Sequence, residues 1–98
     1  MDVKVKNSAF AALAGHLERL RVERQHLIDD AFSSLCARRA LLAGMLIEEF
    51  GSPARAAIWV TSHQRVFGGR TPLEVLAEGD DDLVWDALGR DGAGHAHI

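Results

Sequence analysis

Residues that could bind a metal ion or carry out catalysis are few and widely spaced in this chain. A single residue separates His95 from His97. Their glycine-rich segment supplies no further ligand, so they could hold a metal only loosely. Cys36, the single cysteine, has no sequence neighbour that marks it as a nucleophile, and we expect a small buried apolar residue. Aspartates 80–82 lack the alternating spacing of a calcium-binding loop and are expected to begin a helix.

The other sources of catalytic chemistry are also missing from the sequence. No set of residues resembles a nucleophile with its base and oxyanion hole, and the FGGRT segment lacks the spacing of a phosphate-binding loop. We expect His16 and His26 on a solvated helix surface, and His63 to cover or cap the loop before a pair of glycines. The sequence therefore predicts a protein that is not an enzyme and needs no metal or cofactor.

The segment FGGRTPLEVLAEG contains more residues with strong local conformational preferences than any other part of the chain. Gly68 and Gly69 permit backbone angles that other residues resist. Thr71 is expected to cap a short helix, with Pro72 at its first position and Glu74 completing a capping box. A turn followed directly by a helix start is the structure that this order of residues predicts.

Arg70 has no structural task in that prediction, although it is displayed on a well-defined corner. Arginine carries five donors and is suited to anchoring a protein interface, so we expect Arg70 to contact a partner. The alternative is that it pairs with a nearby acid such as Glu74. The glycine-rich tail from 92 to 98 is expected to be non-helical and flexible, and it could reach into a partner's cleft.

The elements that must position this corner are predicted to be helices. The first helix begins at Asn7 or Ser8 and carries an apolar stripe. The stripe has nearly the spacing of a coiled-coil seam and consists of Phe10, Leu13, Leu17, Leu20 and Leu27. It is interpreted either as the core-facing side of a small bundle or as the seam of a homodimer, and we predict a homodimer.

A second helix is expected from Ala31 to Phe50, after a break at Asp29 or Asp30, although one long bent helix remains an alternative. Gly51 then ends this helix, and Ser52 with Pro53 begins the third. The inward-facing residues of the last two helices are predicted to be Leu73, Leu76, Val84, Ala87 and Leu88. The predicted fold is all-α, with two long N-terminal helices followed by three short ones.

Composition and charge limit the classes of function. A chain of 98 residues with 48% hydrophobic and 26% charged residues suits one folded domain. The unpaired cysteine and the lack of a signal-peptide pattern predict a cytoplasmic protein. The net charge of −3 argues against a surface that binds nucleic acid throughout.

Any DNA contact would come from the first half of the chain. Residues 1–50 hold seven basic and seven acidic residues, whereas residues 51–98 hold four basic and seven acidic ones. The candidate phosphate contacts are Arg21, Arg24, Arg38 and Arg39. Glu18 and Glu23 are mixed among them, which favours ordinary solvated helix faces.

From about Glu48 onward the chain resembles the toxin-binding domain of Xre/MbcA/ParS-type antitoxins. The resemblance lies in EEFGSPARAAIWVTSHQRVFGGRTPLEVLAEGDDDLVWDALGR, a little under half of the chain. The positions that match the family pattern are Phe50-Gly51, Trp59-Val60, Gly68-Gly69, Pro72-Leu73, Val75-Leu76, Gly79, Val84 and Leu88.

This resemblance implies the neutralising half of a type II toxin–antitoxin pair. The family's usual partner is a RES-domain toxin that consumes NAD, and the antitoxin obstructs the toxin's active site with a contribution from its C-terminal end. The toxin contacts expected on this basis are Gly68, Gly69, Arg70, Thr71, Gly92, His95, His97 and Ile98.

The N-terminal half departs from the family pattern. Many members bind their operator through an N-terminal helix-turn-helix, but residues 8–50 have the pattern of two long helices and no recognition-helix signature. We therefore expect residues 1–50 to serve dimerisation or DNA binding and residues 51–98 to bind the toxin, within one compact domain. A stand-alone dimerisation or scaffold module and an operator-binding repressor remain alternatives.

Overall fold

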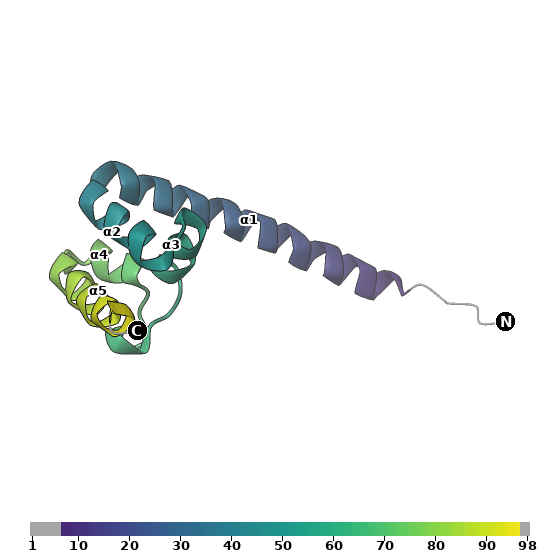
Figure 1. Cartoon of the computed structure of the whole chain (residues 1–98). Coiled ribbons are helices and arrows are strands. Elements are labelled where there is room, and N and C mark those ends of the chain that lie inside the picture. The colour runs from purple at the N-terminus through teal and green to yellow at the C-terminus, as the bar shows by residue number, and fades with distance from the viewer. Residues whose placement is uncertain (1–6, 97–98) are drawn as a thin grey trace.

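Helices make up all the regular structure of the described residues, as the sequence predicts. The computed structural model describes residues 7–96, with side chains described up to residue 89. The elements are α1 (Ser8–Arg38), α2 (Ala40–Phe50), α3 (Pro53–Val60), the 3-10 turn η1 (Arg65–Phe67), α4 (Pro72–Ala77) and α5 (Asp81–Ala96). Figure 1 shows two parts: a helical body, and the first two-thirds of α1 projecting from it. The molecule measures 60 × 31 × 25 Å. None of the described helices is both long enough and apolar enough to cross a membrane.

The helix starts follow the capping signals in the sequence. The side chain of Asn7 accepts a hydrogen bond from the Phe10 amide at 3.1 Å, and α1 begins at Ser8. Ser52 caps α3 in the same way, with Pro53 at the first position. Gly51 ends α2 with φ 88°, the left-handed conformation that glycine adopts without strain.

The break between the first two helices lies at Arg39, so the predicted break at Asp29 or Asp30 is wrong. Asp29 accepts a hydrogen bond from Gln25 at 3.0 Å within the helix, so its carboxylate is not used as a cap. Arg39 leaves the helical conformation with φ −137°, and α2 turns back to pack against α1. The reversal brings the buried face of α1, at Leu35, toward the buried face of α2, at Leu42.

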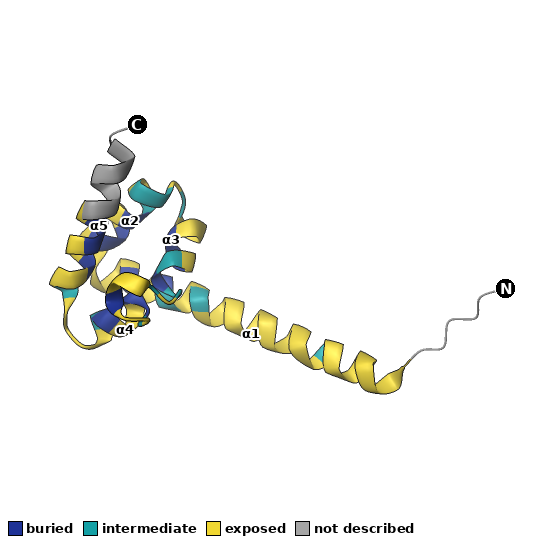
Figure 2. Cartoon of the chain, turned by 90° about the horizontal axis from the view of Figure 1, so that it is seen from below, coloured by how far each residue is buried: buried dark blue, intermediate teal, exposed yellow. Residues whose placement is uncertain are grey.

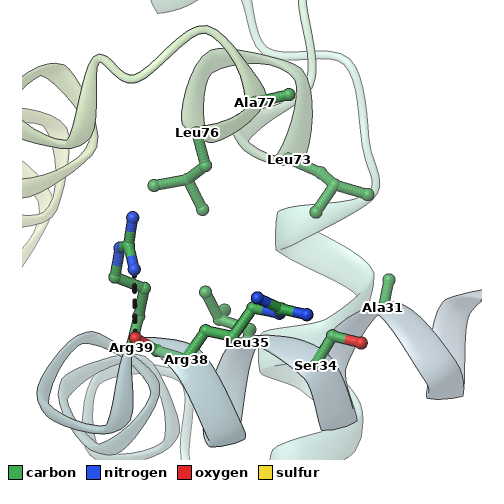
Figure 3. Close-up of a pocket in the computed structure, with 8 residues that line it drawn as sticks. All are labelled: Ala31, Ser34, Leu35, Arg38, Arg39, Leu73, Leu76 and Ala77. Atoms are coloured by element: carbon green, nitrogen blue, oxygen red, sulfur yellow. Dashed lines mark hydrogen bonds between the residues drawn. The ribbon is translucent and has the colours of Figure 1, made fainter.

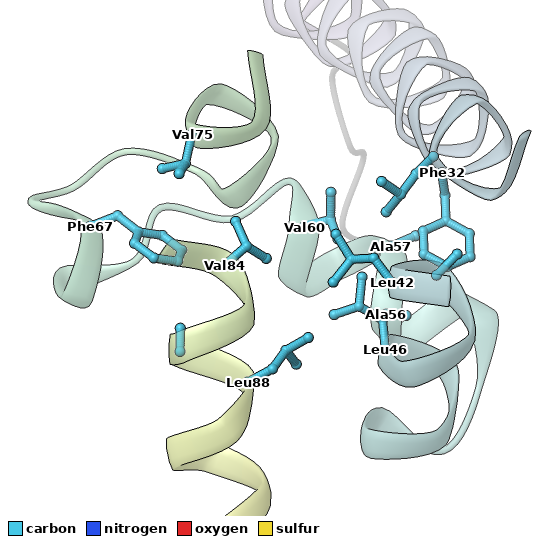
Figure 4. Packing of buried hydrophobic residues seen from close by; sticks show 13 residues of the cluster. Phe32, Leu42, Leu46, Ala56, Ala57, Val60, Phe67, Val75, Val84 and Leu88 are labelled. Carbon is cyan, nitrogen blue, oxygen red and sulfur yellow. The ribbon is translucent and has the colours of Figure 1, made fainter. Parts of the chain in front are cut away.

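The hydrophobic core lies where α2, α3, α4 and α5 meet the last turns of α1 (Figure 4). Leu46, Val60, Val75 and Val84 are fully buried there. The predicted inner face of α5 is confirmed, since Val84, Ala87 and Leu88 are all buried. Burial of this kind, at roughly 25 cal/mol per Å² of apolar surface, is the main stabilising contribution to a small helical body.

The projecting arm, residues 8–27 of α1, takes no part in this core. The stripe residues Phe10, Leu13, Leu17, Leu20 and Leu27 are between 48% and 69% exposed. Figure 2 shows the arm as an almost continuously exposed helix. The interpretation of the stripe as the core-facing side of a bundle is therefore wrong for this chain.

Three further expectations need correction. Cys36 is exposed and is not the buried apolar residue that the sequence predicted. Leu73 is exposed and Leu76 half-buried, whereas Val75 is fully buried, so the inner face of α4 is displaced from the predicted one. The last helix continues to Ala96, because glycines weaken a helix without forbidding it and elongation adds one hydrogen bond per residue.

Candidate functional site

The corner loop, residues 61–71 between α3 and α4, is closed by its own backbone hydrogen bonds. The Gln64 amide donates to the Arg70 carbonyl at 3.0 Å, and the Gly69 amide donates back to the Gln64 carbonyl at 2.9 Å. The 3-10 turn η1 lies inside this ring, with Phe67 buried beneath it. The loop is therefore a fixed structural element on the surface of the body.

Both glycines of the corner adopt the predicted left-handed conformation. Gly68 has φ 66° and Gly69 has φ 90°, and a Cβ atom at either position would meet open space. The backbone conformation, and not crowding, is therefore what demands glycine here. His63 covers the corner as expected: its Nδ1 donates to the Gly69 carbonyl at 2.7 Å, which requires the tautomer with a proton on Nδ1.

The predicted capping box at the start of α4 is confirmed. The Glu74 amide donates to Thr71 Oγ1 at 3.0 Å, and the Thr71 amide donates to Glu74 Oε1 at 2.9 Å. The hydrogen bond from the Thr71 backbone lowers the pKa of Glu74, with smaller contributions from the Thr71 side chain and from the charges of His63 and Arg70. Thr71 is buried, and its two hydrogen bonds with Glu74 fix the end of the corner loop at the start of α4.

Arg70 has a structural task, as predicted by the alternative in which it pairs with a nearby acid. Its Nε donates to the Phe67 carbonyl at 3.0 Å across the glycine turn. Its Nη1 forms an ion pair with Glu78, at the C-terminal end of α4, instead of with the expected candidate Glu74. The pair is reachable because the capped, six-residue helix α4 ends beside the corner. The guanidinium is held in place while remaining partly exposed.

A hollow of about 320 Å³ lies beside Arg70, between the corner loop and α5. Its rim includes two exposed apolar side chains, Val66 at 54% and Leu83 at 42% exposure, together with Asp86. Sequence reasoning missed these three residues. Leu83 lies four residues before the buried Ala87, at the edge of the inner face of α5, so helical spacing alone does not mark it as exposed.

Aromatic rings support the corner from the body side. Trp59 stacks on Phe50 with ring centroids 5.3 Å apart and meets Phe67 edge to face at 6.3 Å. Gln64 Nε2 donates to the Trp59 carbonyl at 3.2 Å, which joins the loop to the end of α3. These contacts connect the outer surface of the corner to the core.

The other predicted toxin contacts belong to the C-terminal end of the chain. The side chains of His95, His97 and Ile98 lie outside the described residues, as does the backbone of the last two positions, and Gly92 falls within α5. Among the residues that the structure describes, no cluster of three or more His, Cys, Asp or Glu side chains could hold a metal ion.

The four candidate DNA-contacting arginines are divided between two places. Arg21 lies on the arm, where it pairs with Glu18 at 2.7 Å and lowers the pKa of that carboxyl mainly by hydrogen bonding. Arg24 is on the exposed surface of α1, near the base of the arm. Arg39 pairs with Asp81 at 2.7 Å, which ties the start of α5 to the turn between α1 and α2.

Arg38 and Arg39 also line a groove of about 380 Å³ between α1 and α4. Figure 3 shows Leu73 and Leu76 of α4 on one side of the groove, facing Leu35, Arg38 and Arg39. Two of the four arginines thus meet acidic partners.

These features form a small helical domain with a closed surface corner and a projecting helix. Comparison with protein families matches residues 45–94 to the antitoxin Xre/MbcA/ParS C-terminal toxin-binding domain. The match covers half of the chain, and the chain belongs to this family of antitoxins. It includes α3, the corner loop, α4 and most of α5. Comparisons with curated proteins and with solved structures gave no match.

Proposed function

We propose that this protein is the antitoxin of a type II pair and that it neutralises a RES-type, NAD-consuming toxin. Neutralisation occurs by direct binding and obstruction of the toxin's active site, in the cytoplasm, without catalysis by the antitoxin. The observation that carries the proposal is the family match over residues 45–94, which includes the whole corner.

The corner has the physical properties of an anchoring surface. Arg70 is oriented by Phe67 and Glu78 before any partner arrives, so little side-chain freedom is lost on binding. Exposed apolar area at Val66 and Leu83 lies next to this charge. Arginine is one of the residue types enriched at interface hot spots, and neighbouring contacts around a hot spot serve to exclude water.

We assign toxin contact to this corner, with Gly68 and Gly69 allowing close backbone approach and Thr71 fixing the loop. The C-terminal residues Gly92, His95, His97 and Ile98 are proposed to enter the toxin's cleft. The exposed stripe on the arm, from Phe10 to Leu27, is proposed to form a homodimer, because a solvated row of large apolar side chains is unfavourable in a lone helix.

Co-expression with the toxin encoded by a neighbouring gene tests the proposal. Wild-type protein should restore growth and co-purify with the toxin. A chain ending at Asp91 should still bind but should fail to restore growth if the C-terminal residues obstruct the active site. Absence of co-purification for the wild type would contradict the antitoxin function.

Two other functions remain as alternatives. A stand-alone dimerisation or scaffold module would explain the arm without a toxin, and an isolated gene would favour it. An operator-binding repressor would use Arg21, Arg24, Arg38 and Arg39, and a salt-dependent shift of promoter DNA would favour that function.

A further inference from the structure

The arm carries an apolar stripe that touches nothing else in the described chain except at its base. Phe10, Leu13, Leu17, Leu20 and Leu27 alternate at spacings of three and four residues, with Arg24 in the remaining position of the series. This spacing keeps one side of a helix facing a second helix over the full length of the arm. The order of the stripe residues indicates which second helix this is and in which direction it runs.

The series of six positions reads the same in both directions, so two copies can pair antiparallel in one fixed register. In that register Phe10 faces Leu27 of the second copy, and Leu17 faces Leu20 of the second copy. Arg24 then faces Leu13 of the second copy, where its stem can cover the leucine and its charge can reach solvent. A parallel pair in register would instead place Arg24 against the same residue of the second copy, which is a repulsive contact.

The residues that flank the stripe agree with the antiparallel direction. In the same register His16 of each copy lies beside Glu23 of the other, and both contacts are on one edge of the pair. His16 Nδ1 accepts a hydrogen bond from Arg19 Nη2 at 3.3 Å, so a neutral His16 carries its proton on Nε2 and can donate to that carboxylate. The parallel register would place His16 beside Arg21 of the second copy.

A hollow at the base of the arm supplies a second, independent observation. Four of its lining residues, Arg24, Leu27, Ile28 and Ala31, are spaced as the four residues that surround an inserted side chain in helix pairs. Its far wall is made by Leu73 of α4 with Thr61 and Thr71, and its volume is about 210 Å³. The antiparallel register brings Phe10 of the second copy to this hollow. That contact would cover Leu73, which is 38% exposed although the sequence predicted that it would face inward.

We propose that two copies pair through their arms in an antiparallel direction, with Phe10 of each copy seated in the hollow beside Leu73 of the other. This proposal rests on the homodimer proposed above and gives it a direction, a register and a contact to the body. The two corners then lie at opposite ends of the dimer. Each copy can bind its own toxin without sharing a surface, which gives a complex of two antitoxins and two toxins.

The single cysteine allows the direction to be measured on the unaltered chain. Cys36 is exposed, so it accepts a nitroxide spin label, and pulsed electron paramagnetic resonance then measures the distance between the two labels in a dimer. The antiparallel register places the two Cys36 positions about 50 Å apart along the arms, since a helix rises about 1.5 Å per residue. A parallel dimer would place them within roughly 20 Å, about two helix diameters.

Cross-linking provides a second measurement that does not depend on the label. In a Cys36→Ser background, a mixture of Phe10→Cys and Leu27→Cys chains should form a disulfide-linked dimer on mild oxidation, whereas each variant alone should not. In a parallel dimer the result is reversed, because only identical positions meet.

Each outcome decides one proposal. A long distance with a cross-link only in the mixture supports the antiparallel pair. A short distance, or cross-linking of each variant alone, overturns the antiparallel proposal and leaves the homodimer standing. A monomer in sedimentation at micromolar concentration overturns both, while toxin binding is measured separately by co-purification.

Discussion

At the scale of residues, Arg70 holds two contacts within the chain and still presents part of its guanidinium to solvent. We expect Arg70→Ala to lower the free energy of unfolding by no more than about 1–2 kcal/mol, because a partly exposed ion pair and one hydrogen bond contribute little each. Toxin affinity should fall at least tenfold, as expected for an interface anchor. Urea unfolding and titration calorimetry measure the two effects.

Glu78→Gln is the matched control for that substitution. It removes the ion pair but leaves Arg70 in place with its hydrogen bond to the Phe67 carbonyl. If Glu78→Gln weakens toxin binding as much as Arg70→Ala does, Arg70 acts by shaping the loop and the direct contact is refuted.

Gly69 tests the left-handed backbone of the corner. Gly69→Val should lower the melting temperature by several degrees, because a β-branched side chain resists φ 90° even though the space around it is open. Gly44→Ala is the control, since Gly44 lies in α2 with open space around it and without a positive φ. Alanine there should raise the free energy of unfolding by up to about 1 kcal/mol. An unchanged melting temperature for Gly69→Val would show that the corner does not need its present conformation.

Glu74 gives the start of α4 a dependence on pH. Its pKa is lowered in the folded chain because its carboxylate accepts the Thr71 amide, so the ionised form is favoured by folding. This contribution is present above the ordinary carboxyl pKa of 4.5 and is lost as the pH falls through the lowered value. Glu74→Gln should therefore reduce the loss of stability below pH 4.5. Equal acid dependence for both proteins in urea unfolding would contradict this role.

At the scale of elements, the arm is the part of the chain whose helix is least supported by the body. Leu17→Glu should convert the dimer to a monomer, because it places a charge in the middle of the proposed seam. Val22→Glu is the matched control: Val22 is also exposed on the arm but lies outside the stripe. Sedimentation velocity should show a monomer for the first variant and a dimer for the second.

The monomeric variant should also lose helix signal in circular dichroism, since an isolated arm is only marginally stable as a helix. The core of the body lies elsewhere, in Leu42, Leu46 and Val60, and its cooperative unfolding should change little. If the Leu17→Glu variant remains a dimer, the interface lies somewhere other than the stripe.

At the scale of the whole molecule, the sequence predicted those features that depend on a few adjacent residues. The caps at Asn7, Ser52 and Thr71 are local hydrogen bonds; Ser52 and Thr71 were predicted from residue type and spacing, and Asn7 was one of two candidates for the first cap. The all-helical fold followed from the apolar spacing, and the glycine corner followed from the positive φ that Gly68 and Gly69 supply.

Features that depend on contacts between distant segments were not predictable in this way. The reversal at Arg39 has no glycine or proline, and it is determined by how α1 and α2 bury one face each. The pairing of Arg70 with Glu78 depends on where the short helix α4 ends. The hollow beside the corner is lined by both Val66 of the loop and Leu83 of α5, and no local pattern indicates that these two residues share a surface.

This protein is proposed to bind a toxin and inhibit it. The most direct measurement is the rate at which the purified toxin encoded by the adjacent gene consumes NAD, with increasing amounts of this protein added. We predict that the rate falls to background at one antitoxin chain per toxin chain, and that a chain ending at Asp91 binds without abolishing the rate. An unchanged rate, together with no complex of the two proteins in size-exclusion chromatography, would contradict the account.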